Sequence, residues 1–153
     1  PPLFARRYTT VFQDTLSIAN MWADPTHYDK YLKDNKFLPK YNGLTDDAAE
    51  NARRKANFLR VKKMVYLVGD MGAKTYDGGI GPWESGAWGY YTTGSETEFI
   101  TMEATEVYTG DTFGLKSLDD RGDLEVKTVP DVGHNSWVND SPTRTTYVFP
   151  HLD

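Results

Sequence analysis

An uninterrupted apolar run from Met64 to Val68 is the clearest feature of the hydrophobic pattern. A run this short, with β-branched residues, is typical of a buried strand, although periodicity alone does not exclude a buried helix. Gly69 ends the run and Asp70 follows it. In open α/β sheets, sites are assembled at the carboxyl ends of strands, which makes Asp70 a candidate site residue. The alternative is that Asp70 only caps a turn, because Gly-Asp is common in turns.

The chain before this strand contains a segment with helical periodicity. Residues 3–22 place apolar side chains at steps of three and four, which predicts a long amphipathic helix. Asp24-Pro25 ends it, because the residue before a proline is disfavoured in the helical region. Core packing is the ordinary role of such a face, and a ligand wall is the alternative. Residues 26–43 carry turn signals and predict a loop that can include a short turn of helix.

A second helix is predicted over residues 46–60. Thr45 suits the N-cap, acidic residues occupy the first turn, and arginines and a lysine follow, as the helix dipole favours. The helix is expected to lie on the surface, with a narrow apolar stripe formed by Ala48, Ala52, Ala56 and Leu59. Its basic half is interpreted as a solvated face, with a phosphate or lipid-headgroup patch as the alternative.

The segment after Asp70 is rich in glycine. Residues 71–87 contain five glycines and one proline, and loops of this length inside compact domains are usually functional. The sequence Gly78-Gly79-Ile80-Gly81 lacks the spacing and the following helix of a phosphate-binding loop. We therefore do not expect nucleotide binding.

The last third of the chain predicts short strands and a terminal helix. Residues 88–91 read as a strand with which residues 99–108 can pair in antiparallel fashion. Residues 124–129 alternate between apolar and polar side chains and predict a second longer strand. Pro142 and Pro150 confine any C-terminal helix to the stretch between them.

His134 lies in the loop after the second predicted strand, as Asp70 lies after the first. A lone loop histidine is most often a surface residue. In the triads of α/β-hydrolases, the acid and the histidine also follow late strands of the sheet, in this order along the chain. The pair is therefore a candidate acid–base couple.

Composition narrows the class of protein. The chain of 153 residues is long enough for one domain, and its net charge of −5 argues against nucleic-acid binding. No segment approaches the roughly 18 continuous apolar residues of a membrane span. The absence of cysteine excludes thiol nucleophiles and thiolate metal sites, and we expect no metal and no cofactor. Ten tyrosines and four tryptophans suggest that some rings line a groove or a partner surface. Because the chain begins at Pro1-Pro2 without Met, we expect a processed product or a fragment.

Four ordered motifs resemble the palmitoyl-protein thioesterase family. They are Trp22-Ala23-Asp24-Pro25, the pair Pro82–Ser85 and Trp88–Tyr91, the stretch from Val107 to Asp119, and Pro150-His151-Leu152. The similarity covers most of the chain in the family's order, with an insertion around residues 74–80.

The resemblance implies the C-terminal part of an α/β-hydrolase, with late sheet strands and flanking helices preceded by helices of the cap subdomain. Residues 1–61 would be the cap segment and return helix, and residues 62–153 the core. Asp70 matches the triad aspartate, and His134 matches the triad histidine, although the family's Gly-Asp-His is Val132-Gly133-His134 here. Trp22 matches a cap tryptophan that lines the acyl groove, and Met71 is expected to contact substrate as well.

The motif of the triad's nucleophile is absent, since no Gly-x-Ser-x-Gly occurs in the sequence. We therefore expect the serine to come from an N-terminal part or chain of the same precursor, without which this chain is inactive. The substrate implied by the family is a fatty acyl thioester, such as a palmitoylated protein. A lysosomal or secreted location is implied as well.

Two other classes remain open at this point. The first is a non-catalytic acyl-binding or adaptor protein that kept the fold and lost the nucleophile. The second is an aromatic-rich carbohydrate-binding module, which predicts an all-β structure. The two helices predicted before Arg60 argue against this second class.

Overall fold

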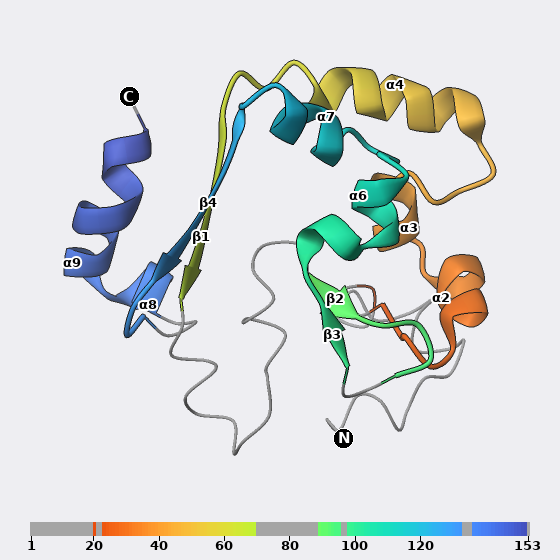
Figure 1. Ribbon diagram of the computed structural model, residues 1–153, viewed down its shortest axis with the longest axis horizontal. Helices are drawn as coiled ribbons and strands as arrows, with labels where there is room; N and C mark the ends of the chain where they lie inside the picture. Colours follow the sequence, from red (N-terminus) through yellow and green to blue (C-terminus); the bar gives the residue numbers. More distant parts are fainter. Residues whose placement is uncertain (1–19, 21–22, 70–88, 96–97, 133–135, 153) are drawn as a thin grey trace.

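The computed structural model describes residues 20, 23–69, 89–95, 98–132 and 136–152 (Figure 1). The strands in this part are β1 (Met64–Gly69), β2 (Tyr90–Tyr91), β3 (Phe99–Ile100) and β4 (Leu124–Val129). The α-helices are α2 (Tyr28–Asp34), α3 (Leu38–Tyr41), α4 (Ala48–Phe58), α6 (Glu106–Thr109), α7 (Leu115–Asp120), α8 (Ser136–Asn139) and α9 (Ser141–Thr143). Short 3₁₀ turns lie at Met102–Ala104 and Phe149–His151, and a π turn lies at Arg144–Val148.

The two longer strands form a parallel pair. β1 and β4 are aligned over their full length, from Met64 opposite Leu124 to Gly69 opposite Val129. Both strands were predicted from the apolar pattern, and both predictions are confirmed. Because the strands are parallel, their carboxyl ends lie at the same edge of the sheet (Figure 1). Helices joined to a parallel sheet confirm the expected α/β class.

The second sheet is a small antiparallel pair. Tyr90 lies opposite Ile100 and Tyr91 lies opposite Phe99, so the predicted antiparallel pairing is confirmed. The strand predicted over residues 99–108 was too long, because the chain turns into a 3₁₀ turn at Met102 and then into α6. The hydroxyl of Thr105, which donates to the carbonyl oxygen of Met102, stabilises this local turn.

The helix predicted over residues 46–60 is confirmed as α4, but its cap was assigned wrongly. The side chain of Asp47 accepts a hydrogen bond from the backbone N–H of Glu50 at 3.0 Å. Thr45 instead donates its hydroxyl to the Asn51 side chain at 2.9 Å. The three alanines of the predicted apolar stripe are exposed. Arg54, Lys55 and Phe58 attach the helix to the rest of the protein.

The prediction for residues 26–43, a loop with a short turn of helix allowed, is only partly right, because the structure has two helices there, α2 and α3. α2 forms around Tyr31, whose ring is almost completely buried. The side chain of Asn35 then accepts hydrogen bonds from the backbone N–H groups of Phe37 and Leu38, which fixes the start of α3. Pro39 suits the first turn of α3, where no intrahelical N–H is needed. The predicted helix over residues 3–22 lies outside the described residues, apart from Asn20.

The buried core joins the helices to the parallel strands. Met102, Phe113 and Leu115 form its centre, and side chains from α4, β1, α6 and β4 pack against them. The ring of Phe58 on α4 meets the ring of Phe113 edge-on, with centroids 5.0 Å apart. Gly114 precedes α7 with a φ of +105°, and a Cβ there would lie 2.9 Å from a methyl of Leu59. A glycine is therefore required where α4 crosses the start of α7.

The C-terminal segment is helical from Ser136 to His151, apart from a break before α9. The prediction that Pro142 and Pro150 confine the helix to the stretch between them is wrong, because α8 precedes Pro142 and helical turns include both prolines. Each proline occupies the first turn of its element, where the missing N–H is tolerated. In the described part of the chain, no helix combines the length and the apolar character needed to span a bilayer.

Candidate functional site

The carboxyl edge of the parallel sheet is defined by a close main-chain contact. Gly69, the last residue of β1, packs against Val132, which follows β4 by three residues. A Cβ on residue 69 would lie 2.1 Å from the Val132 carbonyl oxygen and 2.9 Å from its carbonyl carbon. Real Cβ atoms do not approach backbone atoms so closely, so only glycine allows this contact.

The four site residues predicted from the sequence are Trp22, Asp70, Met71 and His134. All four lie outside the described residues. Their neighbours in the chain are described, and these fall into two places. Gly69 and Val132 lie together at the sheet edge, and Ala23, the residue after Trp22, lines a pocket.

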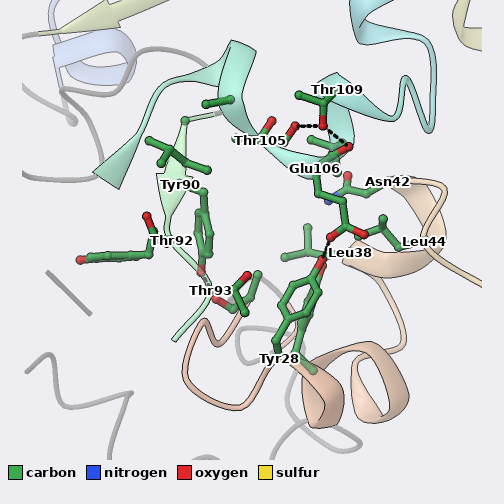
Figure 2. A pocket seen from close by; sticks show the side chains of 17 residues that line it. Tyr28, Leu38, Asn42, Leu44, Tyr90, Thr92, Thr93, Thr105, Glu106 and Thr109 are labelled. Atoms are coloured by element: carbon green, nitrogen blue, oxygen red, sulfur yellow. Dashed lines mark hydrogen bonds between the residues drawn. The ribbon is translucent and has the colours of Figure 1, made fainter. Parts of the chain in front are cut away.

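This pocket lies between α2, α3 and the β2–β3 sheet and has a volume of about 520 Å³. Figure 2 shows the ring of Tyr90 on one side and the side chains of Leu38 and Leu44 on the other. Tyr31 and Ile100 add further apolar surface. A concave site of this volume, mostly apolar with a few polar groups, is typical of a site for a small apolar ligand.

Two of the four described tyrosines that line the pocket donate their hydroxyl groups to protein oxygen atoms. Tyr28 donates its hydroxyl to Glu106 Oε2 at 2.5 Å, and burial together with this carboxylate raises the pKa of Tyr28 (Figure 2). Tyr90 donates its hydroxyl to the carbonyl oxygen of Ala23, and burial raises the pKa of Tyr90. Both phenols therefore stay neutral over the physiological pH range, and neither brings a charge to the pocket.

A buried carboxylate fixes the chain at the entry to α2. Asp24 is 2% exposed and accepts hydrogen bonds from the backbone N–H groups of Thr26 at 2.9 Å and His27 at 3.1 Å. Its second oxygen lies 3.1 Å from Nδ1 of His27. Burial acts to raise the pKa of Asp24, but the hydrogen bonds from Thr26 and His27 outweigh it and hold that pKa below its ordinary value. This turn sets the position of Ala23 in the pocket wall.

Sequence reasoning did not find the pocket. Its lining comes from three separate stretches, around residues 23–44, 89–93 and 100–109, and no local pattern reports that they meet. The available signal was the excess of aromatic residues, which predicted a ring-lined groove without locating it. Within the described residues, no group of three or more histidine or acidic side chains is placed to hold a metal ion.

A parallel β-pair flanked by helices, with its carboxyl edge closed by a glycine contact, is typical of part of an α/β fold. The family model for palmitoyl protein thioesterase matches residues 2–134 of the chain. This protein therefore belongs to the palmitoyl protein thioesterase family, and the resemblance seen in the four motifs is confirmed.

Three curated relatives illustrate the similarity. The chain is 39% identical over 141 residues to lysosomal thioesterase PPT2-B of Xenopus laevis, covering 92% of this chain and 46% of the relative. It is 38% identical over 136 residues to lysosomal thioesterase PPT2 of Homo sapiens, covering 89% and 42%. It is 31% identical over 147 residues to palmitoyl-protein thioesterase 3 of Dictyostelium discoideum, covering 95% and 48%.

These relatives are considerably longer than the present sequence. The chain spans less than half the length of the curated relatives it matches. The expected lysosomal or secreted setting is confirmed to the extent that the relatives from Xenopus and human are named lysosomal thioesterases.

Proposed function

We propose that this chain is the C-terminal part of a serine-triad thioesterase that removes fatty acyl groups from thioesters, including S-acylated proteins. Asp70 and His134 act as the acid and the base of the triad. The serine comes from an N-terminal part of the same precursor that carries Gly-x-Ser-x-Gly. The observation that carries this proposal is the contact of Gly69 with Val132 at the carboxyl edge of the parallel strands.

Chain connectivity links this contact to the proposed triad. Asp70 follows Gly69 directly, and His134 follows Val132 through one further residue. Consecutive Cα atoms are about 3.8 Å apart, so Asp70 stays within about 4 Å of Gly69, and His134 within about 8 Å of Val132, measured between Cα atoms. Two segments in contact therefore lead into the acid and the histidine. This supports their working as one pair.

The proposed chemistry uses the pair as general acid and base. His134 takes the proton of the serine hydroxyl as the serine oxygen attacks the thioester carbonyl carbon. It then gives this proton to the thiolate that leaves, and the acyl group stays on the serine. A water molecule, deprotonated in turn by His134, attacks the acyl carbon, and the bond to the serine oxygen breaks to release the fatty acid. His134 returns the proton to the serine oxygen. Asp70 holds the imidazole in the right tautomer and stabilises its positive charge.

The partial burial of β1 and its single pairing partner within the described ranges support a further neighbouring strand from the rest of the polypeptide. Strands of parallel sheets are normally covered on both faces. All six residues of β1 are only partly buried, and among the described residues β1 pairs with β4 alone. A strand from the N-terminal part would complete the sheet on the other side of β1 and bring the serine to the carboxyl edge.

The acyl chain is proposed to be bound by apolar area, as a fatty chain offers few other contacts. Trp22 and Met71 would contact the chain near the triad. The pocket that begins at Ala23 provides further apolar surface beyond Trp22, and its volume of about 520 Å³ suits a long chain. The lysosomal setting of the named relatives extends to this chain within the same proposal.

The test is hydrolysis of a palmitoyl thioester by the complete protein, including any polypeptide that purifies with this chain. Asp70→Asn is expected to lower kcat about 10⁴-fold, since a triad without its carboxylate holds the wrong histidine tautomer. His134→Gln should lower it to a similar extent. Asp131→Asn and His151→Gln are matched controls for the two changes and should retain activity.

Two results would contradict the proposal. The first is full activity in both triad variants. The second is binding of fatty acid without turnover by the complete wild-type protein, which would support the adaptor interpretation instead. The identity of the co-purifying polypeptide, and whether it carries Gly-x-Ser-x-Gly, tests the proposed source of the serine.

A further inference from the structure

α3 has two different faces. Leu38 and Asn42 line the pocket on one face (Figure 2). Phe37 and Tyr41, one helical turn apart, point away from the core with 50% and 52% of their surface exposed. Their ring centroids lie 4.7 Å apart, so the two rings form one aromatic surface. Two large rings are thus held side by side in solvent, which is unusual for a surface that contacts only water.

Three lysines are close to these rings in the sequence. Lys33, Lys36 and Lys40 are all exposed, and Lys40 Nζ lies 6.0 Å from the centroid of the Tyr41 ring. We call Phe37, Tyr41 and these three lysines the aromatic–basic face. Its positive charge contrasts with the net charge of −5 of the whole chain.

Glu50 on α4 feels the charge of Lys40, but two arginines also bind it. Glu50 on α4 is bound by Arg53 at 2.6 Å and by Arg54 at 2.6 Å. The guanidinium carbon of Arg54 also lies 5.6 Å from the centroid of the Tyr41 ring, which fixes the ring against α4. The aromatic–basic face is therefore both positively charged and held in place by its neighbours.

We propose that the aromatic–basic face docks on the surface of a lipid bilayer that contains anionic lipids. Aromatic rings with one polar tip prefer the boundary between lipid headgroups and acyl chains. Lysines beside them extend their apolar stems along the membrane and place their ammonium groups among the phosphates. Each lysine near an anionic membrane adds roughly fivefold to binding. A lipid surface is favoured over an acidic protein because two half-exposed aromatic rings accompany the positive charge.

Because of the position of α3, docking would bring the pocket close to the membrane. The helix is the wall between the membrane-facing rings and the pocket lined by Leu38 and Asn42. Docking would place the pocket within one helix diameter, about 10 Å, of the membrane surface. The docking itself does not rest on the proposed thioesterase activity, because it depends only on the exposed face of α3.

The test is co-sedimentation of the purified protein, with any polypeptide that accompanies it, with lipid vesicles. Vesicles of phosphatidylcholine and phosphatidylserine are compared with vesicles of phosphatidylcholine alone. The wild type is expected to bind the anionic vesicles and to lose binding at high salt, which screens surface charge. Phe37→Ala and the double variant Lys33→Glu/Lys40→Glu should each weaken binding by roughly tenfold or more. Phe37→Trp should retain it, because tryptophan has the same interfacial preference.

The control is a second pair of exposed cations. The double variant Arg60→Glu/Lys62→Glu makes the same change in net charge. Both residues follow the C-terminal end of α4 and lie outside the aromatic–basic face. This variant should bind the anionic vesicles nearly as the wild type does. The proposal is overturned if the wild type does not bind them, if both double variants lose binding equally, or if Phe37→Ala binds unchanged. Thermal unfolding of each variant shows that the fold is retained, which is expected because the altered side chains are exposed.

Discussion

Gly69 and Val132 lie so close together that no side chain fits between them. β1 and β4 are in register up to Gly69 and Val129, and the chain after β4 then turns back so that Val132 covers the end of β1. The two segments that continue toward Asp70 and His134 thus leave the sheet from one point. The geometry of this sheet edge therefore requires glycine at position 69.

Gly69→Ala is expected to separate these two segments. The new methyl group would lie 2.1 Å from the Val132 carbonyl oxygen, and neither main chain can move without disturbing the β1–β4 register. Overpacking of this kind typically costs about 1–3 kcal/mol of stability. We expect a lower denaturant midpoint. In the complete protein, we also expect kcat to fall at temperatures where the variant is still folded.

Gly122→Ala provides a matched control for that substitution. Gly122 has a φ of +75°, and a Cβ there meets no atom within 4 Å. Its replacement should cost about 1 kcal/mol from backbone strain alone, with kcat unchanged. Equal effects of the two substitutions on kcat would show that the contact at residue 69 does not position the site.

The ion pair of Lys55 with Asp111 is expected to stabilise the protein in a pH-dependent way. Lys55 Nζ lies 2.6 Å from Asp111 Oδ2, and the hydroxyl of Ser117 donates to the same carboxylate. Burial acts to raise the pKa of Asp111, but the hydrogen bonds from Lys55 and Ser117 outweigh it, so the folded-state pKa lies below the ordinary value of 3.8. A lowered folded pKa stabilises the protein above the ordinary value, and this contribution is lost as the pH falls through the folded pKa.

Asp111→Asn should therefore lower the melting temperature at neutral and mildly acidic pH. The difference from the wild type should shrink below about pH 4, where the wild-type carboxylate begins to take up protons in the unfolded chain. A double-mutant cycle with Lys55→Met should give a coupling of about 1 kcal/mol for this partly exposed pair. A stability difference that stays constant down to strongly acidic pH would contradict the role assigned to the charge.

Leu115 is expected to be a major source of stability. Its side chain has no exposed surface and lies at the centre of the core that joins α4, α7 and the parallel strands. Leu115→Ala should cost about 2–5 kcal/mol in denaturant unfolding, because it removes buried apolar surface and leaves a cavity. Val138→Ala, at a side chain that is 75% exposed, should stay within about 0.5 kcal/mol of the wild type.

The pocket is expected to set the preferred length of the acyl chain, if the proposed thioesterase activity is correct. Leu38→Trp places a larger side chain into the pocket between α3 and Tyr90. It should raise KM for a palmitoyl thioester several-fold and leave a short-chain thioester unaffected, because only the long chain needs the filled volume. The measurement is the ratio of kcat/KM for the two substrates.

Phe37→Trp is the matched control at the adjacent residue. It adds the same ring on the outer face of α3, where Phe37 is half exposed and does not line the pocket. The chain-length preference should then be that of the wild type. A change of equal size in both variants would mean that α3 affects catalysis in some way other than by filling the pocket.

The strands and α4 could be predicted from the sequence because their signals are local. β1 is a continuous apolar run and β4 an alternating one, and each ends at a residue that disrupts the pattern. The N-cap of α4 was misassigned because Thr45 and Asp47 are both suitable caps, and in the structure Thr45 donates its hydroxyl to the Asn51 side chain instead. The residue type at each position does not show which of the two side chains caps the helix.

The two helices of residues 26–43 and the pocket depend on tertiary structure. α2 and α3 are short, and each is stabilised by one buried or capped position, Tyr31 in the first and Asn35 before the second. Neither helix is long enough for its apolar residues to show a helical period in the sequence. The pocket requires three distant stretches to meet. The predicted residues Trp22, Asp70, Met71 and His134 lie outside the described residues, so their assignment remains a prediction supported by neighbouring contacts.

The parallel pairing of β1 with β4 has a consequence for the order of folding. Residues 70–123 separate the two strands along the chain, so their pairing closes a long loop and is slow compared with the formation of α4 or of the β2–β3 hairpin. The local helices and the hairpin can form early, whereas Gly69 meets Val132 only once β4 has added to β1. Any polypeptide that pairs with the other edge of β1 before that moment would act as a template for the strand, and would speed the assembly of the edge.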